Sequence, residues 1–194
     1  MRTAFPPFHA LAWLLLAGAA QAKREDFHLD PVHTRVAFQV SHAGFSRPVA
    51  TFSKVEGELQ FDEADWRTAH VEVRIPVATL ELGNADWQKK ILDRTFFDAA
   101  TFPQARFVST TVEPTDATHA RVTGDLTLHG ITRPATLNVT FHGAGPNPFK
   151  KKVLTVGFDG EGVVKRSDYG MGKYAPLVSD ETKIVFSAAW ELAK

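Results

Sequence analysis

Cysteine is missing from this sequence of 194 residues. Its absence excludes disulfide bonds, thiolate metal sites and a cysteine nucleophile, so an apolar core must hold the fold together. An excess of one charge is missing too, because 22 Lys and Arg side chains balance 22 Asp and Glu side chains. This balance argues against a protein whose main task is to bind nucleic acid. The residue type in evident excess is phenylalanine, which occurs 15 times.

Residues 1–22 have the composition of an export signal. A positive residue near the start is followed by an apolar run from Ala10 to Ala20, and small residues precede a polar stretch. We expect cleavage after Ala22, which leaves residues 23–194 as one domain in the periplasm. A membrane anchor and a buried helix are the alternatives, but a membrane span needs roughly 20 apolar residues, more than this run provides.

Apolar and polar residues alternate through most of the remaining chain, which is the pattern of half-buried β-strands. Short turn signals separate these segments, and about eight antiparallel strands joined by short loops indicate a sandwich or a barrel. Three glycines between residues 157 and 162 fall inside one strand candidate, and they favour a barrel because glycine permits bulges and corners. Only the β-rich segment 106–112 does not assign its apolar residues clearly to one face. The clearest alternating sets are residues 36–40, 55–61, 71–77, 137–141, 154–158 and 184–192.

One connecting segment departs from the strand pattern. Asn84 is a suitable cap for a short helix, on which Trp87 and Ile91 share one face. The segment then carries three phenylalanines before a proline that no helix can pass undisturbed. Two interpretations of this aromatic cluster stand: a hydrophobic plug over one end of a barrel, or a lid beside the entrance for a ligand. The cluster consists of Phe96, Phe97 and Phe102.

Two polar residues are candidates for recognising the polar end of a ligand. His42 shares the face of the apolar residues before it and ends its strand, so it either lies at a barrel mouth or is satisfied by backbone groups. Arg166 alternates with Ser167 and so shares a face with Asp168. The two charges either pair with each other to fix a turn, or Arg166 binds an anionic head group.

Other polar residues are expected to be structural. His33 follows Asp30 at a spacing suited to a hydrogen bond within a turn, and His129 shares the polar, outward face of its strand with Asp125. A loop with Phe149 followed by three lysines, residues 150–152, is either a solvated hairpin tip or a point of transient contact with an anionic membrane.

Linear signatures of catalysis and of metal binding are lacking. The chain has no nucleophile elbow, no phosphate-binding loop and no dinucleotide fingerprint, and its eight histidines show no zinc-site spacing. We therefore expect no enzymatic activity, no metal and no cofactor. A catalytic site assembled from distant strands remains an alternative.

Five segments, in order and over most of residues 26–192, resemble the YceI-like family. They are Asp30–His42, Phe52–Asp62, the phenylalanine-rich stretch from Phe96 to Ser109, Gly124–Pro134 and Arg166–Met171. The resemblance implies a lipocalin-like antiparallel β-barrel around an elongated apolar cavity, which binds a long-chain isoprenoid lipid of the polyprenyl or prenylated-quinone type. It also implies a possible homodimer. Where many members have an Arg-Asp pair and a His-Leu in the helix, this chain has Trp87–Ile91, which leaves the ligand class open.

We thus expect an exported carrier that sequesters such a lipid inside the barrel. The alternatives are an enzyme acting on a lipidic or quinone substrate, and a stress-related structural protein with a filled barrel, because strand pattern alone does not distinguish a cavity from a packed interior. The residues expected to bind the ligand are Phe38, Val40, His42, Val73, Ile75, Phe107, Leu126, Val139, Phe158, Arg166 and Phe186.

Overall fold

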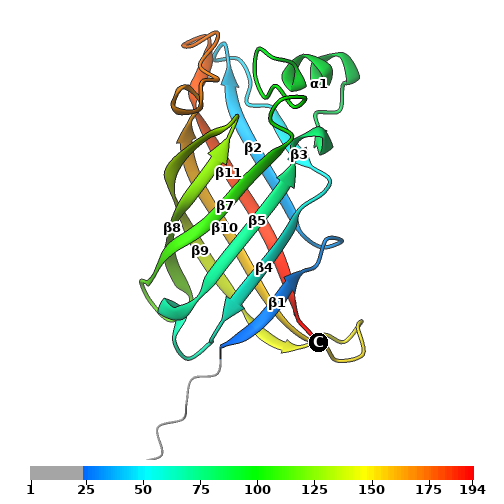
Figure 1. Ribbon diagram of the computed structural model, residues 1–194, viewed down its shortest axis with the longest axis vertical. Helices are drawn as coiled ribbons and strands as arrows, with labels where there is room; N and C mark the ends of the chain where they lie inside the picture. The colour runs from blue at the N-terminus through cyan, green and yellow to red at the C-terminus, as the bar shows by residue number, and fades with distance from the viewer. Residues whose placement is uncertain (1–23) are drawn as a thin grey trace, which may run out of the picture.

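The computed structural model describes residues 24–194, and the expected signal segment 1–22 lies outside them (Figure 1). Among the described residues, no helix is long and apolar enough to cross a membrane. The strands are β1 (Glu25–Leu29), β2 (Arg35–His42), β3 (Val49–Phe52), β4 (Glu56–Phe61), β5 (His70–Pro76), β6 (Leu80–Glu81), β7 (Gln104–Pro114), β8 (His119–Leu128), β9 (Ile131–Pro146), β10 (Leu154–Lys165) and β11 (Val178–Leu192). The α-helix is α1 (Ala85–Leu92), and single 3₁₀ turns span Trp66–Thr68, Val77–Thr79 and Arg166–Tyr169.

Eight strands close an antiparallel barrel, as the alternating pattern predicted. The order is β1-β4-β5-β7-β8-β9-β10-β11, and β1 returns to pair with β11. The last residues of β11 pair with β1, whereas its residues 182–187 pair with β2. Strands β2, β3 and β6 therefore extend the barrel wall beyond the end of β1, toward the end where Figure 1 shows α1.

A bulge explains why the apolar residues of segment 106–112 do not all fall on one face of a regular strand. The pairing of β7 with β8 shifts register between Ser109 and Thr111, so one extra residue inverts the alternation. Phe107 before the bulge and Val112 after it consequently both face the interior, although one number is odd and the other even. A second register shift occurs beside Gly157 in β10, where the glycine pattern predicted irregularity.

Gly160 of β10 leaves room for an aromatic side chain of the neighbouring strand. A Cβ atom at this position would lie 2.4 Å from the ring of Phe186, its pairing partner on β11. A methyl group does not fit at that distance, so glycine is what allows the Phe186 ring to lie flat across β10.

Aromatic side chains close the end of the barrel that lies opposite α1, which is the lower end in Figure 1. The rings of Phe61 and Phe158 meet edge to face with their centroids 5.3 Å apart, and Trp66 meets Phe141 edge to face at 5.2 Å. Trp190 of β11 belongs to the same buried cluster. These rings bury large apolar surfaces in the packing geometry that aromatic pairs favour, which makes this end a packed floor.

A buried carboxylate fixes the bend between β1 and β2. The side chain of Asp30 is only 1% exposed, and its Oδ2 accepts a hydrogen bond from Lys150 and contacts Nδ1 of His33, both at 2.8 Å. The turn contact between Asp30 and His33 is thus confirmed. Lys150, however, also contacts Glu191 at 2.7 Å, so the expectation that it lies at a freely solvated hairpin tip was wrong. The loop anchors the first turn of the barrel instead.

Candidate ligand-binding site

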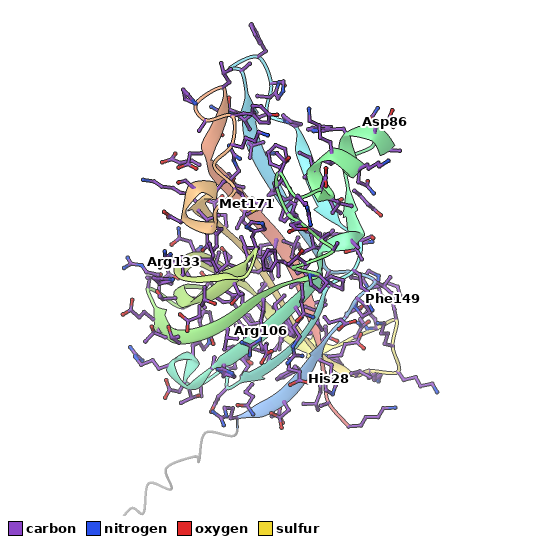
Figure 2. All side chains as sticks on the ribbon, turned by 45° about the horizontal axis from the view of Figure 1, so that its top comes forward. His28, Asp86, Arg106, Arg133, Phe149 and Met171 are labelled. Carbon is purple, nitrogen blue, oxygen red and sulfur yellow. The ribbon has the colours of Figure 1, made fainter. Side chains whose placement is uncertain are left out.

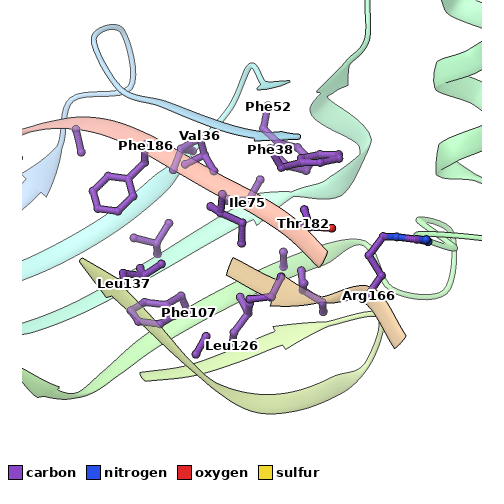
Figure 3. Close-up of a pocket in the computed structure, with 18 of the residues that line it drawn as sticks. Val36, Phe38, Phe52, Ile75, Phe107, Leu126, Leu137, Arg166, Thr182 and Phe186 are labelled. Carbon is purple, nitrogen blue, oxygen red and sulfur yellow. The ribbon is translucent and has the colours of Figure 1, made fainter. Parts of the chain in front are cut away.

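The barrel encloses a cavity of about 640 Å³ above the aromatic floor. A packed interior, the alternative that strand pattern could not exclude, is therefore not what this chain forms. The volume lies in the range typical of sites for small apolar ligands. All eleven residues expected from the sequence to bind a ligand line this one cavity: Phe38, Val40, His42, Val73, Ile75, Phe107, Leu126, Val139, Phe158, Arg166 and Phe186. Figure 3 labels Phe38, Ile75, Phe107, Leu126, Arg166 and Phe186 among them.

The cavity is closed below and open above. Among its lining residues near the floor, Phe61, Trp66 and Trp190 are almost fully buried. At the other end several lining residues are exposed, and Leu177 keeps 70% of its surface accessible to solvent. His42 at the end of β2 belongs to the same exposed rim. A long ligand would therefore enter at the end of the barrel that carries α1 (Figure 1).

Helix α1 forms one side of this rim. The Asn84 side chain accepts a hydrogen bond from the backbone N–H of Trp87 at 2.9 Å, so the predicted cap is confirmed. Trp87, Lys90 and Ile91 all line the cavity. The helix thus presents an apolar face with one cation to the interior, at the position where the sequence departs from the family pattern.

The three phenylalanines after the helix do not form one cluster. Phe97 packs between Phe38 and Phe52, with ring centroids 6.0 and 6.2 Å away, and lines the cavity. Phe96 also lines the cavity. Phe102 lies elsewhere, with its ring 4.6 Å from that of His129. The segment is accordingly part of the upper wall, and the prediction of a single aromatic plug or lid was wrong in grouping Phe102 with the other two.

His42 lies where its parity predicted, on the inner side of β2 at the open end. Its backbone N–H donates a hydrogen bond to the carbonyl oxygen of Ser46 at 2.9 Å, which closes the turn that follows. The residue is exposed and borders the cavity, so its imidazole is accessible both to solvent and to a ligand at the rim.

Arg166 does not form the expected ion pair with Asp168. Its guanidinium donates to backbone carbonyl groups instead, from Nε to Ser179 and from Nη2 to Val178, both at 2.9 Å. Nη1 donates to the carbonyl of Met171, and the carbonyl of Lys173 accepts the longer contacts of 3.4 and 3.5 Å. All five N–H groups of the guanidinium therefore face backbone oxygens, and together they fix the start of β11.

The charge of Arg166 is buried with little compensation. Only 8% of the residue is exposed, and burial lowers the pKa of the guanidinium. The nearby carboxylate of Asp180 opposes that shift, but Asp180 accepts its own hydrogen bonds from Ser167 at 2.6 and 2.8 Å. The upper part of the cavity thus lies beside a positive charge whose direct partners are neutral carbonyl groups.

Asp125 is exposed on β8 as predicted, but His129 is not an outward strand residue. Strand β8 ends at Leu128, and His129 begins the hairpin turn with a left-handed φ of 49°. Its Nδ1 lies 3.0 Å from the carbonyl oxygen of Tyr169. Together with its contact to Phe102, this ties three segments of the upper barrel together.

Thr182 is a polar lining residue that the sequence prediction missed, as are Thr34 and Lys90. It lies in β11, is 7% exposed, and its side chain lines the cavity (Figure 3). Its even number places it on the face of Ile184 and Phe186, so the alternation contained the signal. Apart from Thr34, His42, Lys90, Arg166 and Thr182, aliphatic and aromatic residues make up the lining, and no carboxylate of the described chain belongs to it. Within residues 24–194, no cluster of side chains suited to hold a metal ion occurs.

Comparisons with known proteins agree with this architecture. The sequence model of the YceI-like domain matches residues 27–190. A UPF0312 protein of Pseudomonas savastanoi pv. phaseolicola is 37% identical over 158 residues, which cover 80% of this chain and 81% of that protein.

Solved structures with the same fold come from other bacteria. BcnA of Burkholderia cenocepacia superimposes with a TM-score of 0.76 at 28% sequence identity, covering 83% of this chain and 98% of BcnA. A domain of Saccharophagus degradans described as polyisoprenoid-binding superimposes with a TM-score of 0.62 at 17% identity, covering 86% of this chain and 98% of that domain. At that identity the second similarity concerns the fold alone.

Proposed function

The chain belongs to the YceI-like family, and we propose that it is an exported carrier that holds a long-chain isoprenoid lipid inside its barrel. The observation that carries the proposal is the apolar cavity of about 640 Å³, closed by an aromatic floor and open beside α1. Such a lipid is poorly soluble in an aqueous compartment, and each buried CH₂ contributes roughly 0.8 kcal/mol to binding.

The shape and chemistry of the lining support a chain-like ligand with one polar end. Apolar side chains extend from the floor up to the rim, whereas His42, Lys90 and Arg166 lie toward the open end. An apolar tail placed against the floor leaves its head group among these three residues. The fold similarity to the polyisoprenoid-binding domain of Saccharophagus degradans is consistent with this arrangement.

We propose binding rather than catalysis because the lining offers few groups that could transfer protons. His42 lies on the exposed rim, and the guanidinium of Arg166 is occupied by backbone carbonyls. No lining carboxylate of the described residues could act with either of them as a general acid or base. An enzyme of lipidic or quinone substrates would need such a pair near the ligand.

We propose that transient membrane contact, which the sequence offered at Phe149 and the following lysines only as the alternative to a solvated hairpin tip, occurs at the open end instead. Phe149 is 95% exposed, but its loop lies at the end of the barrel opposite α1 (Figures 1 and 2). At the open end, Phe45 is 93% exposed in the turn after β2, and the N–H of Ala43 in that turn donates to the carbonyl of Leu177. Ala43 and Leu177 line the cavity, so the turn that carries Phe45 lies beside the cavity mouth, where a lipid would pass from a bilayer into the barrel.

The location and the assembly of the carrier are part of the proposal. Residues 1–22 direct the chain to the periplasm, and cleavage after Ala22 releases a free domain. The resemblance to the family also suggests a homodimer. N-terminal sequencing of the periplasmic protein tests the cleavage site, and light scattering of the purified protein tests its mass in solution.

Organic extraction tests the proposed ligand directly. The protein is purified without detergent from bacterial periplasm, extracted with chloroform and methanol, and the extract is analysed by mass spectrometry. We expect a stoichiometric lipid whose fragments differ by isoprene units. An extract that contains no lipid, or only phospholipid in proportion to the total protein, would contradict the proposal.

A further inference from the structure

We propose that the aromatic floor of the barrel selects the bound isoprenoid by its length, and that the ring of Phe158 sets the limit. This inference rests on the proposed function and adds one property of the ligand, the number of isoprene units that the cavity holds. A longer chain leaves units in water at the cavity mouth, whereas a shorter chain leaves part of the cavity empty and loses van der Waals contacts.

Phe158 is the phenylalanine of the floor that offers most surface to an incoming chain. It lines the cavity and keeps 9% of its surface accessible, compared with 4% for Phe61, which also lines the cavity. The ring centroid of Phe141 lies 5.1 Å from that of Phe158, but Phe141 is not among the described lining residues. Phe158 therefore contacts both the cavity and a ring behind its lining, so its removal deepens the cavity.

The side chains around Phe158 hold the floor in place, as a length limit requires. The indole N–H of Trp66 donates a hydrogen bond to the carbonyl oxygen of Glu63 at 3.1 Å. The indole of Trp190 packs directly on β4, because a Cβ atom at Gly57 would lie 2.9 Å from its ring. Interlocked rings in a close-packed core do not yield readily to a longer chain.

The size of one ring matches the size of one isoprene unit. A phenyl ring has six carbon atoms and an isoprene unit has five, so Phe158→Ala should make room for about one further unit. The surroundings of such a truncated side chain relax only in part, and the apolar space that remains accepts apolar ligands.

Ala188 offers the opposite change beside Phe158. The two residues pair across β10 and β11, and Ala188 lines the cavity with a small side chain. Ala188→Leu adds apolar atoms at the level of Phe158, so it should shorten the chain that the cavity holds. The two substitutions therefore change the length limit in opposite directions, which a general loosening of the barrel does not do.

Uptake from a mixture of chain lengths measures the limit. Delipidated protein is incubated with phosphatidylcholine vesicles that contain equimolar all-trans polyprenols from farnesol to decaprenol. The lipid bound to the reisolated protein is then extracted and analysed by mass spectrometry. Because every probe already lies in an apolar bilayer, chain length by itself does not favour uptake, and the bound fraction should peak at the length that fills the cavity.

We expect Phe158→Ala to shift the peak by about one unit toward longer chains, and Ala188→Leu to shift it by about one unit toward shorter chains. Phe158→Leu truncates the side chain less and costs less stability, and it should shift the peak in the same direction as Phe158→Ala. Circular dichroism shows which variants are folded; if Phe158→Ala is not, Phe158→Leu takes its place in the comparison.

Phe27→Ala is the matched control. Phe27 belongs to the same buried cluster and is 3% exposed, but it is not among the described residues that line the cavity. The variant loses the same ring from the core without deepening the cavity, so its peak should coincide with that of the wild type.

An unchanged peak in the folded variants of Phe158 and Ala188 would overturn the role of the ring, while uptake by the wild type would still support the carrier function. A shift in Phe27→Ala equal to that in the Phe158 variant would overturn it too, because any loss of core packing would then change the length. If the wild type takes up none of the polyprenols, both this inference and the proposed function fail.

Discussion

The ammonium group of Lys150 lies 2.8 Å from Oδ2 of Asp30, although the two residues are 120 positions apart in the chain. This contact joins the loop between β9 and β10 to the turn between β1 and β2. Asp30 lies almost entirely out of solvent, whereas Lys150 is about one-third exposed. Burial opposes ionisation of Asp30, but hydrogen bonds from Lys150, His33 and two backbone N–H groups outweigh it and hold the pKa of the carboxyl well below its usual value.

Replacing Asp30 should destabilise the barrel even though the residue is remote from the cavity mouth. We expect Asp30→Asn to lower the free energy of unfolding by about 3 kcal/mol, because the ammonium of Lys150 loses a buried anionic partner. Lys150→Gln should lower it in the same direction, and Lys151→Gln, a neighbouring exposed lysine in the same loop, is the matched control. Urea denaturation measures all three. Equal stabilities of the two lysine variants would contradict a specific role for Lys150.

The pH dependence of stability follows from the same carboxyl group. Because the pKa of Asp30 is lower in the folded state than its ordinary value of 3.8, the unfolded chain takes up the proton more readily. The stabilisation is therefore complete above that value and declines as the pH falls below it. Unfolding in urea at about pH 7 and about pH 3 should show the difference between wild type and Asp30→Asn shrinking in acid. A constant difference would contradict the assignment.

Filling the cavity should remove the ligand without unfolding the barrel. Leu137 lines the cavity, and the next residue, Asn138, is exposed on the outer face of the same strand. We expect Leu137→Trp to lose most of the lipid recovered by extraction, because the larger ring occupies the space of the chain. The stability cost should stay near 1–3 kcal/mol. Asn138→Trp introduces the same ring outside and should retain the lipid; equal retention in both variants would argue against an interior ligand.

Contact with anionic membranes should depend on the open end of the barrel. We expect Phe45→Ser to reduce sedimentation with phosphatidylglycerol vesicles by roughly threefold to tenfold, because an exposed phenylalanine no longer enters the bilayer. Phe149→Ser removes an equally exposed ring at the opposite end and should have no effect. If Phe149→Ser reduces sedimentation and Phe45→Ser does not, the membrane contact lies at the lysine-containing loop and this prediction is wrong.

Much of the site follows from period-two alternation, because a closed barrel has one inward face on every strand. This rule places Phe38, Ile75 and Phe186 on the inward face of their strands, although it does not show whether that face lines a cavity or a packed interior. It fails at Val112, because the bulge at Thr110 inverts the alternation and nothing in the local sequence marks that insertion. Thr182 obeys the rule, but a threonine flanked by charged residues is usually interpreted as part of a solvated face.

The contacts that sequence cannot supply are those between distant segments. The partners of Lys150 come from the first turn and the last strand, so its role was invisible in a run of three similar lysines. Arg166 likewise binds the carbonyl groups of Met171 in a loop and of Ser179 near the start of β11, whereas the carboxylate two residues away suggested an ion pair. Every residue has a backbone carbonyl oxygen. The sequence therefore does not indicate which of these oxygens accept hydrogen bonds from the guanidinium of Arg166.

Native mass spectrometry of the detergent-free protein tests the central claim most directly. We expect the folded chain, beginning at Lys23, to carry one noncovalent adduct with the mass of an isoprenoid lipid, released as an intact lipid on collisional activation. Leu137→Trp should show the bare mass under the same conditions. Wild-type protein that retains its folded charge states and shows only the mass of the bare polypeptide would contradict the claim.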